Sequence, residues 1–209
     1  YILSAGCEAP CEGKCKLCTL GEGVSVRELE AAALRYGERA KKKGLLRKKA
    51  KKAAIFGADL FSVFLAGELA KKMYPVTVYC SQSDAADLIA ECIPELPATA
   101  KEATVADLKK ADIKFEFSTD PASAYAETAE KYDLIGASYS VAQQLYPGLT
   151  VDETVMVYRE QKLLTGKTEG VLDAAFAAKK AALSADRLAQ NLDPSNTRGE
   201  EGSVETRLY

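Results

Sequence analysis

The sequence contains no histidine and no tryptophan among its 209 residues. The missing imidazole excludes histidine-based acid–base catalysis, Ser–His or Cys–His nucleophile pairs, and zinc or haem held by histidine. No apolar run approaches the ~20 residues that span a bilayer, so we expect no membrane span. The first residues also lack the basic segment of a secretory signal peptide, and we therefore expect a cytoplasmic protein.

The composition is that of an ordinary globular chain. Apolar residues make up 47% of the sequence and charged residues 28%, which excludes disorder over the whole chain. The net charge of −2 gives no bulk attraction to nucleic acid, so we expect no nucleic-acid partner.

Cysteine is concentrated at one end of the chain, with four of the six cysteines within the first 18 residues. Thiols of a cytosolic chain stay reduced, so such a cluster indicates a metal site before disulfides. Compact runs with two or three residues between thiolates are typical of a cubane [4Fe–4S] cluster. Zinc, which usually takes two separated C-x2-C pairs, and free or disulfide-linked thiols remain the alternatives. The predicted ligands are Cys7, Cys11, Cys15 and Cys18.

The pattern divides the chain into three parts. Residues 1–52 form a Cys-rich leader that we interpret as an irregular loop, followed by a helix and a basic linker. Residues 53–190 form an α/β domain, and residues 191–209 form a polar tail. The two remaining cysteines, Cys80 and Cys92, are expected to pack in the core of the α/β domain.

Hydrophobic periodicity predicts the elements of the α/β domain. A short apolar strand ends at Gly57, a helix follows, and a β-branched strand comes next, which together make a parallel βαβ unit. In the leader, Ser25 and Glu28 have the spacing of a capping box at the start of a helix. The expected strands cover 53–57, 76–80, 113–117 and 132–136, and the expected helices 26–38, 58–73, 122–131 and 171–188.

Residues 35–52 hold ten basic residues against a single acid, Glu38. One interpretation is a docking face for an acidic partner or nucleic acid. The other is a solvated linker helix, and the absence of interleaved aromatics other than Tyr36 argues against single-stranded nucleic acid.

The segment Cys7 to Cys15, followed by Val24 to Glu30, resembles the N-terminal region of glutamate-synthase small-subunit-like oxidoreductases, which use NAD(P)H, FAD and iron–sulfur clusters. In that family a Cys-x(3–4)-Pro-Cys-x3-Cys stretch ligates clusters and precedes a V-x-I-x-x-L-E helix and an FAD-binding βαβ unit. Residues 87–96 look like a conserved family loop, and residues 164–182 look like its closing segment. The resemblance implies a Rossmann-like three-layer fold for the α/β domain.

The chain departs from this family at both nucleotide sites. Only residues 137–163 stand where the family inserts its NAD(P)H domain, so we expect no NAD(P)H site. In the family's G-x-G-P-A-G turn the first glycine is kept as Gly57, but Asp59 and Ser62 replace the other two. The acid expected after the second strand is Cys80. A carboxylate against the pyrophosphate opposes binding, so we expect no bound FAD, with Gly57 as the remaining cofactor-type residue.

Together these features predict that the chain is a truncated relative of that family. It would work as an iron–sulfur electron-transfer subunit of a multisubunit, anaerobic oxidoreductase. Its partners would be other subunits of the complex, docking on the basic segment 35–52 and the tail 191–209. Whether the chain is itself an enzyme stays open. The alternatives are a non-catalytic assembly subunit and a divergent FAD-binding subunit.

Overall fold

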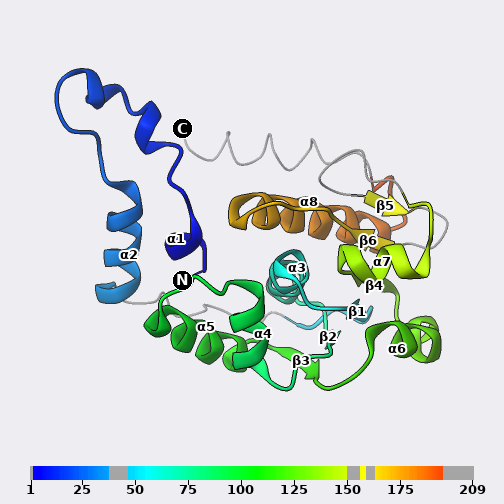
Figure 1. The fold of residues 1–209 in the computed structure, drawn as a ribbon. Helices are drawn as coiled ribbons and strands as arrows, with labels where there is room; N and C mark the ends of the chain where they lie inside the picture. The colour runs from blue at the N-terminus through cyan, green and yellow to red at the C-terminus, as the bar shows by residue number, and fades with distance from the viewer. Residues whose placement is uncertain (1, 38–46, 150–155, 159–162, 195–209) are drawn as a thin grey trace.

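A computed structural model of the chain describes residues 2–37, 47–149, 156–158 and 163–194 (Figure 1). The strands are β1 (Ala53–Phe56), β2 (Val76–Tyr79), β3 (Ile113–Glu116), β4 (Leu134–Ala137), β5 (Met156–Tyr158) and β6 (Leu163–Thr165). The helices are α1 (Ile2–Gly6), α2 (Val26–Tyr36), α3 (Leu60–Lys71), α4 (Ala85–Cys92), α5 (Ala98–Lys110), α6 (Pro121–Thr128), α7 (Tyr139–Leu145) and α8 (Val171–Ala189). Short 3-10 turns cover Glu12–Lys14, Lys16–Thr19 and Ala129–Lys131.

The strands form one sheet in the order β3-β2-β1-β4-β6-β5. The first five run parallel, and β5 pairs antiparallel with β6 at the edge. This order is compatible with a Rossmann-like domain, and the expected α/β class is confirmed. The order reverses between β1 and β4, and the loops that follow these two strands therefore meet at the carboxyl edge of the sheet.

Alternate side chains of β1 supply the two halves of the core. Ala53 and Ile55 pack with α3 and the alanine-rich face of α8, whose small side chains let the helix approach closely. Ala54 and Phe56 point to the other face and pack beneath α6 and α7. All four side chains are buried, as expected for a central parallel strand covered on both faces.

Three aspartates set the starts of helices in the domain. The carboxylate of Asp59 accepts the Ser62 N–H at the start of α3. Asp84 accepts the N–H groups of Ala86 and Asp87 at the start of α4, and Asp120 caps α6 in the same manner. Each cap satisfies backbone donors that the first helical turn leaves unpaired.

Several expected elements differ in the structure. The interpretation of residues 87–96 as a loop is wrong for 87–92, because Asp84 caps a helix that continues to Cys92, and only 93–96 lie outside it. The leader is not wholly irregular, since α1 forms and buries Ile2. The described basic residues 47–52 are not helical. The tail does not begin free of the domain: the Ser184 hydroxyl donates to the Pro194 carbonyl oxygen at 2.9 Å. Residues 195–209 lie outside the described part of the chain.

Candidate functional site

The cysteine-rich loop projects from the rest of the molecule between α1 and α2 (Figure 1). It includes two 3-10 turns, neither of which buries a residue. Cys11 and Cys18 are exposed, and Cys7 and Cys15 are half-buried. All four thiols are free of disulfides, and none of these four predicted ligands is buried.

Cys15 and Cys18 are brought together on this loop. The Cys18 thiol donates to the Glu12 carbonyl oxygen at 3.5 Å. The Cys15 sulfur interacts with the backbone N–H groups of Val24, Leu17 and Cys18 and with the Cys18 side chain. Hydrogen bonds from these amides, that of Val24 first, lower the pKa of Cys15 from its ordinary value. A Cβ on Gly23 would lie 2.6 Å from the Cys18 sulfur, so the returning chain packs closely against this pair.

Cys7 shares one feature of this environment, because the Ala9 N–H lies 3.3 Å from its sulfur. Amide donors to sulfur stabilise thiolate ligands and tune the metal that they hold. The donor set and its N–H groups therefore suit a thiolate-bound metal or cluster. Among the described residues, however, no three Cys, Asp or Glu side chains already form a group that could hold a metal ion. The structure thus brings Cys15 and Cys18 together beside Gly23, without Cys7 or Cys11 completing a ligand group with them.

Helix α2 is tied to this loop by a residue that the sequence pattern did not indicate. The Glu12 carboxylate accepts the Arg27 N–H at 2.9 Å, in the first turn of α2. The Ser25 side chain makes no capping bond, so the predicted capping box is wrong. The Arg27 side chain also donates to the Ala5 carbonyl oxygen at 3.3 Å. A contact fifteen residues away in sequence gives no local signal, and only the folded loop reveals it.

The second candidate region is the carboxyl edge of the sheet, where Gly57 follows β1. Gly57 has φ +86°, and a Cβ there would lie 2.2 Å from the Ser138 hydroxyl after β4. Glycine is therefore required by the close approach of the β1 and β4 loops. The fold itself accounts for this glycine, with or without a bound nucleotide.

Asp59 occupies the start of α3, where a dinucleotide fold binds its pyrophosphate. One carboxylate oxygen accepts the Ser62 N–H at 2.8 Å. The other lies 3.4 Å from the backbone nitrogen of Tyr139, on the loop after β4. The negative side chain thus takes up donors of both loops that would face a phosphate. The residues present do not fit FAD bound in the usual manner.

Side chains of the domain also occupy the region that follows the carboxyl end of β2. Cys80 is fully buried, as expected, and burial raises its pKa to about 11. Cys92 on α4 is half-buried, and burial first, then the charges of Asp59 and Glu91, raise its pKa to about 12. Gln82, two residues beyond Cys80, donates to the Glu91 carboxylate at 2.7 Å. Both thiols therefore stay protonated near neutral pH, unlike good metal ligands.

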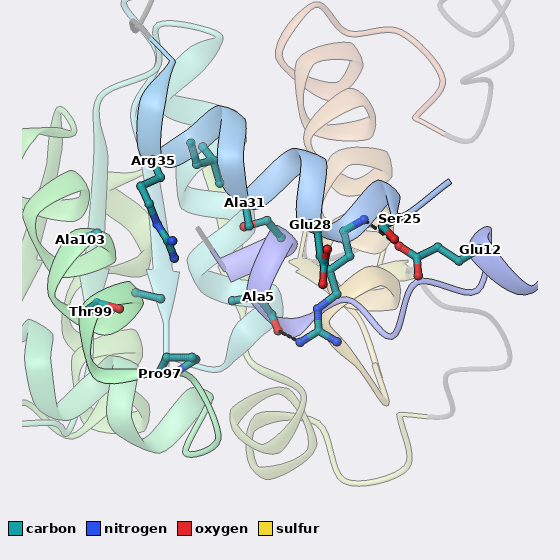
Figure 2. A pocket seen from close by; sticks show the side chains of 13 residues that line it. Ala5, Glu12, Ser25, Glu28, Ala31, Arg35, Pro97, Thr99 and Ala103 are labelled. Carbon is teal, nitrogen blue, oxygen red and sulfur yellow. Dashed lines mark hydrogen bonds between the residues drawn. The ribbon is translucent and has the colours of Figure 1, made fainter. Parts of the chain in front are cut away.

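A cleft of about 690 Å³ is lined by residues of α1, of α2 and of the start of α5. Figure 2 shows Arg35 reaching from α2 toward Thr99 and Pro97. Glu12, Arg27 and Glu28 also line the cleft, so its charges balance and select no ion of one sign. Sequence patterns gave no sign of this cleft.

The described part of the basic segment is largely engaged by the domain. Lys48 pairs with Asp112 at 2.6 Å, Lys49 pairs with Asp186, and Lys51 donates to the Ala189 carbonyl oxygen. These contacts hold residues 47–52 against the sheet domain, which favours a structural role for these lysines over a docking one. The remaining basic residues at 39–43 lie outside the described residues.

Comparison with known proteins leaves the chain without an assigned family. No protein-family model matches it, and no curated protein matches it either. None of the described helices is long and apolar enough to cross a membrane. The resemblance to glutamate-synthase small-subunit-like oxidoreductases therefore stays a prediction based on the residues quoted for it.

Proposed function

We propose that this chain is an iron–sulfur electron-transfer subunit of a multisubunit oxidoreductase. Cys7, Cys11, Cys15 and Cys18 would hold one [4Fe–4S] cluster, which supplies one-electron transfer when it is bound. The observation that carries the proposal is the exposed loop on which two of these sulfurs already receive backbone N–H groups.

The loop residues have defined tasks in this proposal. The amides of Ala9, Leu17 and Val24 offset the negative charge of the thiolates, which favours the ionised sulfur and raises the potential of the group it holds. Glu12 fixes the loop to α2 through the Arg27 N–H. The exposure of Cys11 and Cys18 keeps the site within reach of a partner subunit.

The side chains at the carboxyl edge of the sheet support a domain without its own nucleotide cofactor. Asp59 takes the α3 amide that a pyrophosphate needs, and residues 137–163 are too few for a nucleotide-binding domain. On this account the domain is a scaffold, and electrons reach the chain through partner subunits rather than through its own flavin or NAD(P)H. The divergent FAD-binding alternative retains Gly57 as its main support.

A non-catalytic assembly subunit is the second candidate. It is favoured by α2, a helix with no buried residue, and by the exposed apolar side chains around the cysteine loop. Leu17, Leu20 and Val24 are all exposed there. In this case a cluster or a zinc ion would only fold the leader, and the domain would join other subunits.

One preparation separates these candidates: protein purified without oxygen, with a UV–visible spectrum and with iron, sulfide, zinc and flavin quantified on the same sample. The proposal expects broad absorbance and about four iron and four sulfide per chain, without flavin. Stoichiometric flavin would overturn the scaffold role of the sheet domain. Zinc alone, or no metal, would leave the assembly subunit.

A further inference from the structure

The loop between α1 and α2, which projects from the molecule in Figure 1, carries two cysteines that are held close together by a turn. The Cys18 N–H donates to the Cys15 carbonyl oxygen at 3.0 Å, which closes a turn from residue i to residue i+3. The Cα atoms at the two ends of such a turn lie within about 7 Å of each other. Disulfides join cysteines whose Cα atoms are about 4.4–6.8 Å apart, so the backbone already brings this pair near the separation that a disulfide needs.

The side chains of this pair also meet. The Cys15 sulfur interacts with the Cys18 side chain. A Cβ on Gly23 would lie 2.6 Å from the Cys18 sulfur and 3.6 Å from the Cys15 Cβ, so both cysteines crowd the same point of the returning chain. Both thiols are free, and neither cysteine is buried. The pair is therefore adjacent, reduced and open to a reagent from solution.

We propose that Cys15 and Cys18 form a redox-active dithiol that exchanges with small-molecule disulfides and closes to an intramolecular disulfide. Disulfide oxidoreductases use the same C-x2-C spacing for such exchange. The inference concerns the chain without metal and goes beyond the proposed electron transfer. Whether the chain holds a cluster and whether the metal-free pair exchanges with disulfides are separate questions, and each has its own measurement.

The exchange takes two steps. In the first, the Cys15 sulfur gives its proton to solvent and attacks one sulfur of the small disulfide, so that a mixed disulfide forms, the original S–S bond breaks and the first thiolate leaves and takes up a proton. In the second, the Cys18 sulfur loses its proton and attacks the Cys15 sulfur, which releases the second thiol. Two electrons pass from the dithiol to the substrate, which is reduced to two thiols.

The contacts of the two sulfurs favour this order. Three backbone N–H groups meet the Cys15 sulfur and offset the negative charge that it carries while it attacks. The Cys18 thiol instead donates to the Glu12 carbonyl oxygen at 3.5 Å, which favours its protonated form during the first step. Since a disulfide offers no thiolate, the oxidised pair would bind no metal until a reductant restores it.

The test starts from the full chain, stripped of metal and fully reduced, and mixes it with oxidised glutathione in the absence of oxygen. Free thiols are then blocked with N-ethylmaleimide, and the chain is digested with trypsin for mass spectrometry. Cleavage after Lys14, Lys16 and Arg27 separates the four leader cysteines onto peptides 1–14, 15–16 and 17–27. We expect peptides 15–16 and 17–27 to be joined, at a mass two hydrogens below their sum. Peptide 17–27 joined mainly to 1–14 or to a second 17–27, or all thiols blocked, would overturn the proposal.

Single substitutions test the order of the steps, and since neither cysteine of the pair is buried, the variants should keep the fold. Cys18→Ser should stop with glutathione attached to Cys15, because no second thiol releases it. Cys15→Ser should slow the release of glutathione at least about ten-fold, because the attacking sulfur is gone. Cys92→Ala, which removes a half-buried thiol of the sheet domain, is the matched control and should react like the unmodified chain. Glutathione found on Cys11 instead of Cys15, or an unchanged rate in Cys15→Ser, would contradict the assignment.

Discussion

The leader and the sheet domain differ sharply in how much each buries. Residues 2–36 bury only Ile2, Ser4 and Ala9, whereas the domain holds fully buried side chains from every parallel strand except β3 and from the helices on both faces. The domain therefore has a core of its own. The leader needs support from a metal, from a partner, or from contacts such as Glu12 with α2.

The same contrast appears in the chemistry of the cysteines. In the domain, burial keeps Cys80 and Cys92 protonated, with pKa values near 11 and 12. In the leader, backbone N–H groups lower the pKa of Cys15 and reach the sulfur of Cys7. Thiols in the core thus stay protonated, while two sulfurs on the loop accept backbone N–H groups.

The contrast in burial predicts the largest change in the free energy of unfolding. Leu65 is fully buried on α3, so Leu65→Ala should lower the free energy of unfolding by about 2–5 kcal/mol. Leu29→Ala on α2 should change it by less than about 0.5 kcal/mol, because this side chain is mostly exposed. Urea unfolding of dilute protein followed by circular dichroism measures both. Equal losses would show that the leader shares the core of the domain.

The close approach of the loops after β1 and β4 predicts the next largest loss of stability. Gly57→Ala combines a positive φ with a Cβ placed 2.2 Å from the Ser138 hydroxyl, and should cost about 1–3 kcal/mol. Adding Ser138→Gly removes the closest contact but leaves the Val141 methyl at 2.9 Å and the backbone strain, so it should recover part of the loss in thermal unfolding. Full stability of the single variant would contradict the described packing at this edge.

Removing the Asp59 cap should have a smaller effect. Asp59→Ala leaves the Ser62 N–H unpaired at the start of α3 and should lower the free energy of unfolding by about 1 kcal/mol. Asp59→Asn keeps a capping oxygen and should lose less. If Asp59→Ala were more stable than the unmodified chain, the carboxylate would be strained there, as expected of a site kept for an anion.

The smallest effect is a change in pH dependence at Asp186. Burial disfavours its charge, but hydrogen bonds from Lys49 and Tyr74, with the charges of Lys49 and Lys72, outweigh burial and lower its pKa. A lowered pKa in the folded state contributes stability above the unfolded value of about 3.9, and this stability is lost as pH falls through the folded pKa. Asp186→Asn should therefore flatten the acid limb of stability against pH.

The matched control for this prediction is the exposed pair of Lys48 with Asp112, whose side chains are 56% and 65% exposed. Asp112→Asn should leave the acid limb nearly unchanged, since exposed pairs contribute little. If stability fell with pH as steeply in Asp186→Asn as in the unmodified chain, Asp186 would not be held as described.

Much of the sheet could be predicted from the sequence, and the reasons are physical. The runs at β1, β2 and β4 are short, apolar and followed by polar turns, so their period and length identify them. α8 ends within one residue of its prediction because its alanine-rich pattern is long. α4, by contrast, was hidden by a resemblance to a loop, although Asp84 gives it an ordinary cap.

The candidate site was less predictable because its contacts are distant in sequence. The cysteine spacing singled out the ligands, but the pairing of Cys15 with Cys18 beneath Gly23 depends on how the loop returns. The charge of Asp59 already indicated that a phosphate would be disfavoured at the start of α3. The contact of Asp59 with the Tyr139 amide could be found only in the folded structure. The cleft beside α5 left no pattern at all.

The central claim is that the leader cysteines hold an iron–sulfur cluster, and the most direct measurement is electron paramagnetic resonance of reduced, anaerobically purified protein. The account predicts a cluster signal in the unmodified chain and in Cys92→Ala, and its loss in Cys11→Ser and Cys18→Ser, since both exposed thiols are ligands. A full signal in both leader variants, or none in the unmodified chain, would contradict the account.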